Sequence, residues 1–223
     1  MTKERDGQAR ATAGSTDTPR PAEPGRRRAD ARPAEPGRRR ADAQRNIEAI
    51  LNAGLAYLSQ GHEVNMAEIA RAAGVGRVTL YGHFPAKEAL VDALVAYAIT
   101  RANEALDAVD LGDGPAPQAL ARLIDSAWQI LNEHRQLMRI GPRYLGPERM
   151  RAHHDQVMTR VEQLISRGQR DGDIRTDLPR AWLVTTFYTL LHAATEEVAA
   201  DRLDPVEAGK IVTTTVLAAL AVM

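Results

Sequence analysis

Residues 65–87 constrain the fold of this chain more than any other stretch, because they carry the signals of two short helices separated by a sharp turn. Asn65 is a favoured N-cap residue, and Glu68 completes the sequence pattern of a capping box, so a helix is expected to begin directly after Asn65. Gly74 then ends this helix, since glycine adopts a left-handed conformation without strain. The pattern predicts a helix-turn-helix over residues 65–84.

The same stretch resembles the TetR family of bacterial transcriptional repressors in the order of its short motifs. The motifs that carry the resemblance are Ile69-Ala70, Ala73-Gly74-Val75, Thr79-Leu80-Tyr81, His83-Phe84 and Lys87-Glu88. Three positions depart from the commonest family pattern, namely Gly76, Gly82 and Ala86. These departures concern helix caps and the end of the second helix, so they change local contacts and leave the order of the motifs intact.

The resemblance implies that the second helix is a recognition helix that faces DNA. The matched positions that it places at the DNA are Asn65, Arg77, Val78, Thr79, Tyr81, His83 and Lys87. Arg77 is expected near bases or phosphate, with Thr79 and Tyr81 at the groove. His83 and Lys87 are expected on the phosphate backbone. Asn65 adds a helix N-terminus, whose backbone N–H groups suit a phosphate.

Residues 1–43 are rich in Arg, Pro, Ala and Gly and lack any apolar periodicity, so we expect a disordered tail. The tail contains a perfect tandem duplication of twelve residues, with Arg20–Ala31 repeated as Arg32–Ala43. It holds 11 Lys and Arg against 7 Asp and Glu, a net charge of +4 in a chain whose formal net charge is zero. Two interpretations stay open: an arm that contacts phosphates, or a solvated leader enlarged by a duplication.

Apolar residues recur at intervals of three and four along most of the remaining sequence, which is typical of helices with one buried face. We therefore predict an all-α fold of about nine helices, without strands. Residues 44–88 are expected to form a three-helix DNA-binding domain, and residues 89–223 a helical ligand-binding and dimerisation domain. Within the latter, Gly-Pro pairs are expected to break the chain before a helix that runs from about Glu148 to Arg170.

The last two expected helices, from about Arg180 to Ala199 and from Asp204 onward, are the most apolar part of the sequence. Their apolar faces are wider than one core contact requires. We therefore expect a homodimer in which two helices from each chain form a four-helix bundle. The alternative is that both helices are buried within the monomer.

The C-terminal domain also holds residues that suit a cavity for a small apolar molecule, because aromatic and methionine side chains favour such sites. The candidates are Trp128, Met138, Tyr144, Phe187, Tyr188 and His192. Ordinary core packing is the alternative for each of them, and for His192 a core or interface role. The adjacent residues His153 and His154 point about 100° apart on a helix, so they are expected to be solvated and unable to chelate one metal together.

Several classes of protein are excluded or disfavoured. The chain has no cysteine, so it contains no disulfide and no thiolate metal site. No apolar run approaches the length of a membrane span, and no signal-peptide core is present, so we expect a soluble, cytoplasmic protein without a membrane partner. No nucleotide-binding loop, nucleophile-base pair or metal-ligand spacing occurs. We therefore expect no enzyme activity, cofactor or metal.

Together these patterns predict a homodimeric repressor that binds double-stranded DNA at a palindromic operator and leaves it when a small-molecule effector binds. Two alternatives stay open. One is a ligand-independent DNA binder or an activator of the same fold, and the other is an all-α bundle enzyme, which the absence of catalytic motifs disfavours.

Overall fold

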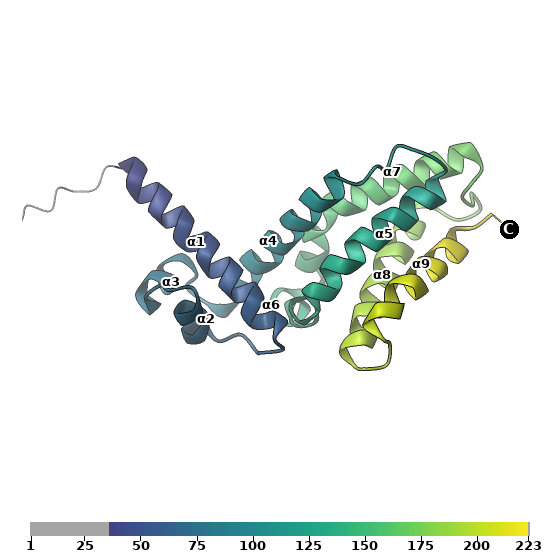
Figure 1. Ribbon diagram of the computed structural model, residues 1–223. Coiled ribbons are helices and arrows are strands. Elements are labelled where there is room, and N and C mark those ends of the chain that lie inside the picture. Colours follow the sequence, from purple (N-terminus) through teal and green to yellow (C-terminus); the bar gives the residue numbers. More distant parts are fainter. Residues whose placement is uncertain (1–35, 223) are drawn as a thin grey trace, which may run out of the picture. The chain divides into compact units, whose positions relative to one another are not determined.

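The computed structural model describes residues 36–222, and this part of the chain is built from helices joined by short connections (Figure 1). Its nine helices are α1 Pro36–Ser59, α2 Met66–Ala72, α3 Arg77–His83, α4 Lys87–Asp107, α5 Ala116–Glu133, α6 Arg135–His153, α7 Asp155–Asp171, α8 Arg180–Ala199 and α9 Pro205–Leu220. The described residues contain no strand, which confirms the predicted all-α fold and its number of helices.

Helix α1 begins at Pro36, eight residues earlier than the predicted domain boundary at residue 44. The second copy of the duplicated segment is therefore helical from its second proline onward. Proline is well accommodated at the start of a helix, and adding residues to an existing helix costs far less than nucleating one. The residues of α1 whose apolar side chains are buried already form a helix, and residues 36–43 extend it. The rest of the predicted tail, residues 1–35, lies outside the described residues.

The segment after α5 differs from its prediction. We expected a broken stretch followed by one helix from Glu148 to Arg170, but α6 continues to His153 and α7 starts at Asp155. The break predicted from the Gly-Pro pairs is present at Gly146, whose φ of 76° and ψ of 162° kink α6. Pro142 lies within the helix and does not interrupt it. The second break, at His154, has no glycine or proline to mark it in the sequence.

Two apolar cores hold these helices together. The first core contains side chains from α1, α2, α3, the first part of α4, and α6. The second core contains the end of α4 together with α5, α7, α8 and α9. Helix α4 thus contributes Leu90 and Leu94 to the first core and Leu106 to the second. Gly54 of α1 lets α4 approach closely, because a Cβ at this position would lie 2.8 Å from a methyl carbon of Leu94.

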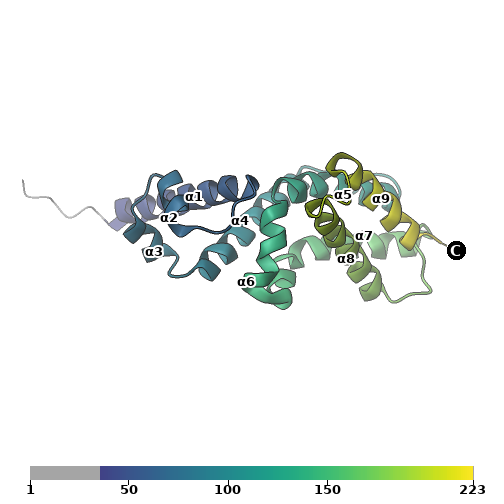
Figure 2. The same ribbon diagram turned by 90° about the horizontal axis from the view of Figure 1, so that it is seen from below.

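The cores do not divide at residue 88. Helix α6 packs against α1 and α4 on one side and against α8 on the other, and Figure 2 shows it between these elements. Its residues Leu137, Ile140 and Met150 are buried in the first core. The described residues 36–222 accordingly belong to one compact unit. The predicted division into domains 44–88 and 89–223 therefore remains a prediction about function, since both parts share a core.

Candidate nucleic-acid interface and buried cavity

Helix α2 begins at a side-chain cap, and its turn into α3 is closed by a backbone hydrogen bond from Val75 N–H to the Ala70 carbonyl (3.0 Å). The Asn65 side-chain oxygen accepts hydrogen bonds from the backbone N–H groups of Ala67 (3.0 Å) and Glu68 (3.3 Å). The reciprocal half of the predicted capping box is absent, because the Glu68 carboxylate accepts from Arg71 instead. Gly74 has a φ of 68°, as the sequence predicted, and the chain turns there into α3.

Helix α3 has one buried and one exposed face. Leu80 is fully buried, and the following Phe84 is 7% exposed, so both anchor the helix on the first core. Arg77, Val78 and Tyr81 lie on the opposite face, where Val78 is 88% exposed and Tyr81 is 50% exposed. Val78 and Tyr81 are therefore large side chains that share the solvent-exposed face of a helix of seven residues.

The other predicted DNA-facing residues lie at different places around this face. Thr79 and His83 are half-buried on the flank of α3, so they do not share the exposed edge on which the sequence analysis placed them. Lys87 is exposed at the start of α4, whose N-cap residue Ala86 makes no side-chain cap. Asn65 is exposed, with its side-chain oxygen engaged in the cap of α2.

Gly82 belongs to the exposed face of α3, although sequence reasoning treated it only as a weak point at the end of the helix. A Cβ on Gly82 would meet nothing within 4 Å, and its backbone does not require glycine. Folding therefore gives no reason for glycine here. A bare helix surface beside Tyr81 allows a partner to approach the backbone closely.

A cavity lies beside the C-terminal half of α4 and is lined by residues on or next to α4, α5, α6, α7 and α8. Its lining is mostly aliphatic and contains no Asp, Glu, Lys or Arg. The polar or aromatic members of the lining are His134, His154, Tyr188 and His192, and Met138 is also present. The volume of about 50 Å³ is smaller than the roughly 150 Å³ of a cavity that accommodates benzene, so a bound molecule requires these helices to move apart.

Three rings form a cluster on one wall of the cavity. The ring centroids of Tyr188 and His192 are 4.3 Å apart, and that of His154 lies 4.9 Å from His192 in an edge-on arrangement. Burial, with the neighbouring His154 as a second and smaller cause, lowers the pKa of His192 to about 3. Burial also lowers the pKa of His154 and of His134, and raises that of Tyr188. All four rings are therefore uncharged at neutral pH.

The predicted ligand-binding residues are only partly brought together. Met138, Tyr188 and His192 line the cavity. Trp128 instead donates a hydrogen bond from Nε1 to the Pro205 carbonyl (3.2 Å), which places it against α9. Phe187 is fully buried in the second core, and Tyr144 packs against the first core. The aromatic type was visible in the sequence, but which face of each helix meets the cavity depends on the packing of five helices.

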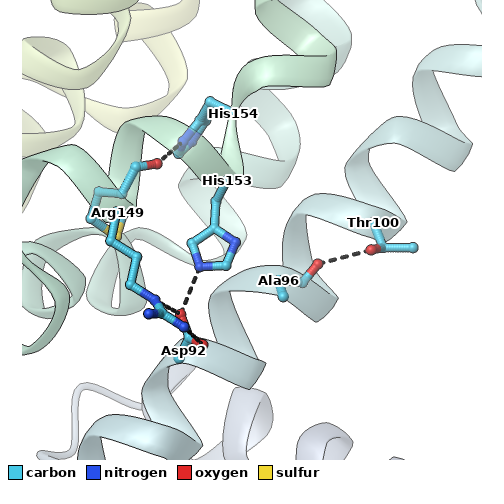
Figure 3. Close-up of polar contacts among 7 residues, drawn as sticks. Asp92, Ala96, Thr100, Arg149, His153 and His154 are labelled. Carbon is cyan, nitrogen blue, oxygen red and sulfur yellow. Dashed lines mark hydrogen bonds and ion pairs between the residues drawn. The ribbon is translucent and has the colours of Figure 1, made fainter.

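His153 and His154 are not the solvated pair that we expected. His154 is 7% exposed, and its Nδ1 lies 2.7 Å from the Met150 carbonyl oxygen. His153 points the other way and contacts Asp92 of α4 at 2.8 Å (Figure 3). The predicted divergence of the two side chains is present, but tertiary contacts bury His154 and half-bury His153. No signal in the local sequence distinguishes a buried histidine from an exposed one.

Asp92, Arg149 and His153 form a polar cluster, the Asp92 cluster, that joins α4 to α6 (Figure 3). Arg149 donates from Nε and a terminal nitrogen to the two carboxylate oxygens of Asp92, at 2.7 and 2.6 Å. The hydrogen bond from Arg149 lowers the pKa of Asp92, and the contact with His153 adds to this effect. This cluster was not among the predicted sites, because Asp92 lies more than fifty residues before Arg149 and His153 in the sequence.

Residues 36–222 contain no group of His, Asp or Glu side chains arranged to hold a metal ion. Among the same residues, no helix has the length and apolar character needed to cross a membrane.

Comparison with known proteins supplies an independent view of this geometry. Residues 50–94 match the family model described as bacterial regulatory proteins, tetR family, and this match covers the end of α1, all of α2 and α3, and the start of α4. The chain is 27% identical over 153 residues to the HTH-type transcriptional repressor LfrR of Mycolicibacterium smegmatis, which covers 69% of this chain and 79% of LfrR. It is also 27% identical over 150 residues to the HTH-type transcriptional regulator NfxB of Pseudomonas aeruginosa, covering 65% and 78% of the two chains.

Among solved structures, the crystal structure of LfrR from Mycobacterium smegmatis in complex with proflavine superposes with a TM-score of 0.62. The superposition covers 82% of this chain and 99% of LfrR, at 23% sequence identity. At this identity the similarity establishes a shared fold.

Proposed function

Because this chain is a DNA-binding regulator of the TetR family of bacterial transcriptional regulators, we propose that it is a homodimeric repressor that a small-molecule effector releases from a palindromic operator. The observation that carries the proposal is the exposed face of α3, where Val78 is 88% exposed on a helix anchored by the fully buried Leu80. Such a regulator acts where the genome is, so we propose a cytoplasmic location.

In this proposal the exposed face of α3 enters the major groove. Arg77 has the donors that read guanine edges or bind phosphate, and Val78 and Tyr81 supply apolar contacts such as those made to thymine methyl groups. Lys87 and the uncapped N-terminus of α4 suit a phosphate on the backbone. Thr79 and His83 are half-buried on the flank of α3, and in this proposal they lie at the edge of the contact with DNA.

We propose that the dimer forms through α8 and α9, the two helices that the sequence predicts for a four-helix bundle between two chains. Most of the apolar stripe of both helices is buried within the chain, including Leu183 and Val216. The exposed apolar residues that remain on them include Trp182 of α8, 59% exposed, and Ile211 of α9, 41% exposed. Ile211 lies beside Glu207, Lys210, Thr214 and Thr215, so an apolar side chain has a polar and charged border, as an interface across a two-fold axis can have.

Release follows from the position of the cavity. Helix α4 lines it with Ala98, Ile99, Ala102 and Leu106, and its other end directly follows α3. A ligand that enlarges the cavity displaces α4, and this changes the spacing of the two recognition helices relative to their half-sites. Reciprocity then requires that DNA weaken ligand binding by the same factor.

The test is binding of the purified full-length protein to DNA upstream of its own gene, with and without candidate metabolites. A footprint over a palindrome that disappears with one metabolite supports a ligand-released repressor. A footprint unaffected by every metabolite would favour the ligand-independent regulator, and absence of any specific footprint would refute the proposal.

A further inference from the structure

The cavity contains a buried hydrogen-bond acceptor without a partner. The Met150 carbonyl can only accept, so the contact at 2.7 Å requires that Nδ1 of His154 carry the proton (Figure 3). In the neutral ring Nε2 is then an acceptor, and it is buried with no hydrogen-bonding partner among the described residues. Unpaired buried acceptors are rare in folded proteins because leaving them unpaired is costly.

The surroundings of this acceptor select against charged molecules. The lining of the cavity contains no carboxylate, so a cation that enters the cavity would lose its hydration without gaining a counter-charge. The Arg151 guanidinium lies 5.1 Å from the centroid of the Tyr188 ring on the wall of the cavity, and this positive charge further disfavours an entering cation. An anion has no donor at Nε2 and would instead meet its lone pair.

The shape of the polar wall selects for a ring. Tyr188 and His192 lie at 45° to each other, and His154 meets both of them edge-on. The opposite walls are aliphatic, with Ile99, Leu106 and Leu131 among them. An aromatic ring placed among these residues makes offset or edge contacts with the three rings and apolar contacts elsewhere.

We propose that the cavity selects an uncharged aromatic molecule with one O–H or N–H group, and that this group donates a hydrogen bond to Nε2 of His154. The inference rests on the proposed ligand-binding function and specifies its chemistry. His154 is the specificity-determining residue because its Nε2 is the buried acceptor without a partner, while the aliphatic walls provide affinity without discrimination.

The experiment compares three single-ring probes on the full-length protein without DNA: phenol, which donates; anisole, which has the same ring and cannot donate; and N-methylpyridinium, a permanent cation. Dissociation constants are measured by calorimetric titration. Phenol should bind about tenfold or more tightly than anisole, since only phenol satisfies a buried acceptor. N-methylpyridinium should bind more weakly than either of them.

A variant and a spectroscopic measurement identify the residue. In His154→Leu the preference for phenol over anisole should vanish while anisole still binds. In His153→Leu, the matched control outside the cavity, the preference should persist. In wild-type protein with ¹⁵N-labelled histidine, phenol but not anisole should shift the resonance of the unprotonated His154 Nε2, a readout that does not depend on how a variant folds.

Equal affinity for phenol and anisole, tighter binding of the cation, or no binding of any probe would overturn the inference. An Nε2 resonance that phenol leaves unmoved would also overturn it. Because no DNA is present, these outcomes are separate from the proposed function, which the footprint experiment with and without metabolites tests.

Discussion

The neutral state of His192 makes the stability of the fold depend on pH, with a direction and a size that follow from its environment. Its pKa is about 3 in the folded chain, against an ordinary value of 6.5 that applies to the unfolded chain. Above pH 6.5 both states leave the ring neutral, so its contribution to stability is fully present. As the pH falls from 6.5 toward 3, the unfolded state binds a proton that the folded state refuses, and stability is lost progressively.

The size follows from the same two values. Each pH unit between them costs about 1.4 kcal/mol, so at pH 5.0 the loss due to His192 alone is about 2 kcal/mol. His134 and His154 also have lowered pKa values and line the same cavity with Tyr188, so the wild-type protein should lose more than this in total. The substitution His192→Gln removes the titrating ring and isolates its share.

The assay is urea denaturation followed by circular dichroism at pH 7.5 and pH 5.0, with wild type and His192→Gln at one protomer concentration. The free energy of unfolding should fall between these pH values by about 2 kcal/mol less in the variant than in wild type. As a control for two-state unfolding, the free energy of unfolding should decrease with urea concentration at the same rate in wild type and variant. An identical pH dependence in wild type and variant would refute the conclusion that the fold withholds a proton from His192.

The remaining predictions concern the DNA-binding face, the dimer and the tail. Tyr81→Ala should leave the urea midpoint nearly unchanged and weaken operator binding at least tenfold in gel-shift titration; normal affinity would contradict the assignment of α3. Gly82→Ala should stabilise the fold by up to about 1 kcal/mol, because its Cβ meets nothing, and still weaken the operator complex if DNA approaches the α3 backbone. Ile211→Asp should yield monomers in sedimentation and lose operator binding in the same sample, an expectation that a monomeric wild type at micromolar concentration would remove. Deleting residues 1–35, which leaves α1 whole, should flatten the plot of log affinity against log salt by about 0.9 for each phosphate that the tail no longer neutralises, whereas an unchanged slope would favour the solvated leader.

The features that sequence reasoning located correctly are those set by neighbours along the chain. Asn65 caps α2, Gly74 adopts a positive φ, and Asp204 caps α9, because each of these depends on a few adjacent residues. The features that it missed depend on distant residues. His154 is buried because α4, α7 and α8 meet around it, and Asp92 is paired because α6 folds back onto α4.

The same distinction explains why the exposed face of α3 could be predicted from the sequence and the lining of the cavity could not. The exposed face of α3 follows from helical spacing once Leu80 is known to be buried, so Arg77, Val78 and Tyr81 were identifiable in advance. The cavity has no such local rule. Phe187 and Tyr188 are adjacent in sequence, yet one lies in the second core and the other on the cavity wall, since a rotation of about 100° separates them on α8.

The sharing of α4 between both cores limits how regulators of this kind can be recombined. A chimera joined at residue 88 would separate Phe84 and Leu58 from the α4 and α6 side chains that cover them, and it would expose or mismatch half of the first core. A transplant of DNA specificity is better confined to the solvent-facing positions of α3, whose side chains touch neither core. In this protein, DNA recognition is therefore expected to be exchangeable through single residues of α3 and not by transfer of a whole domain.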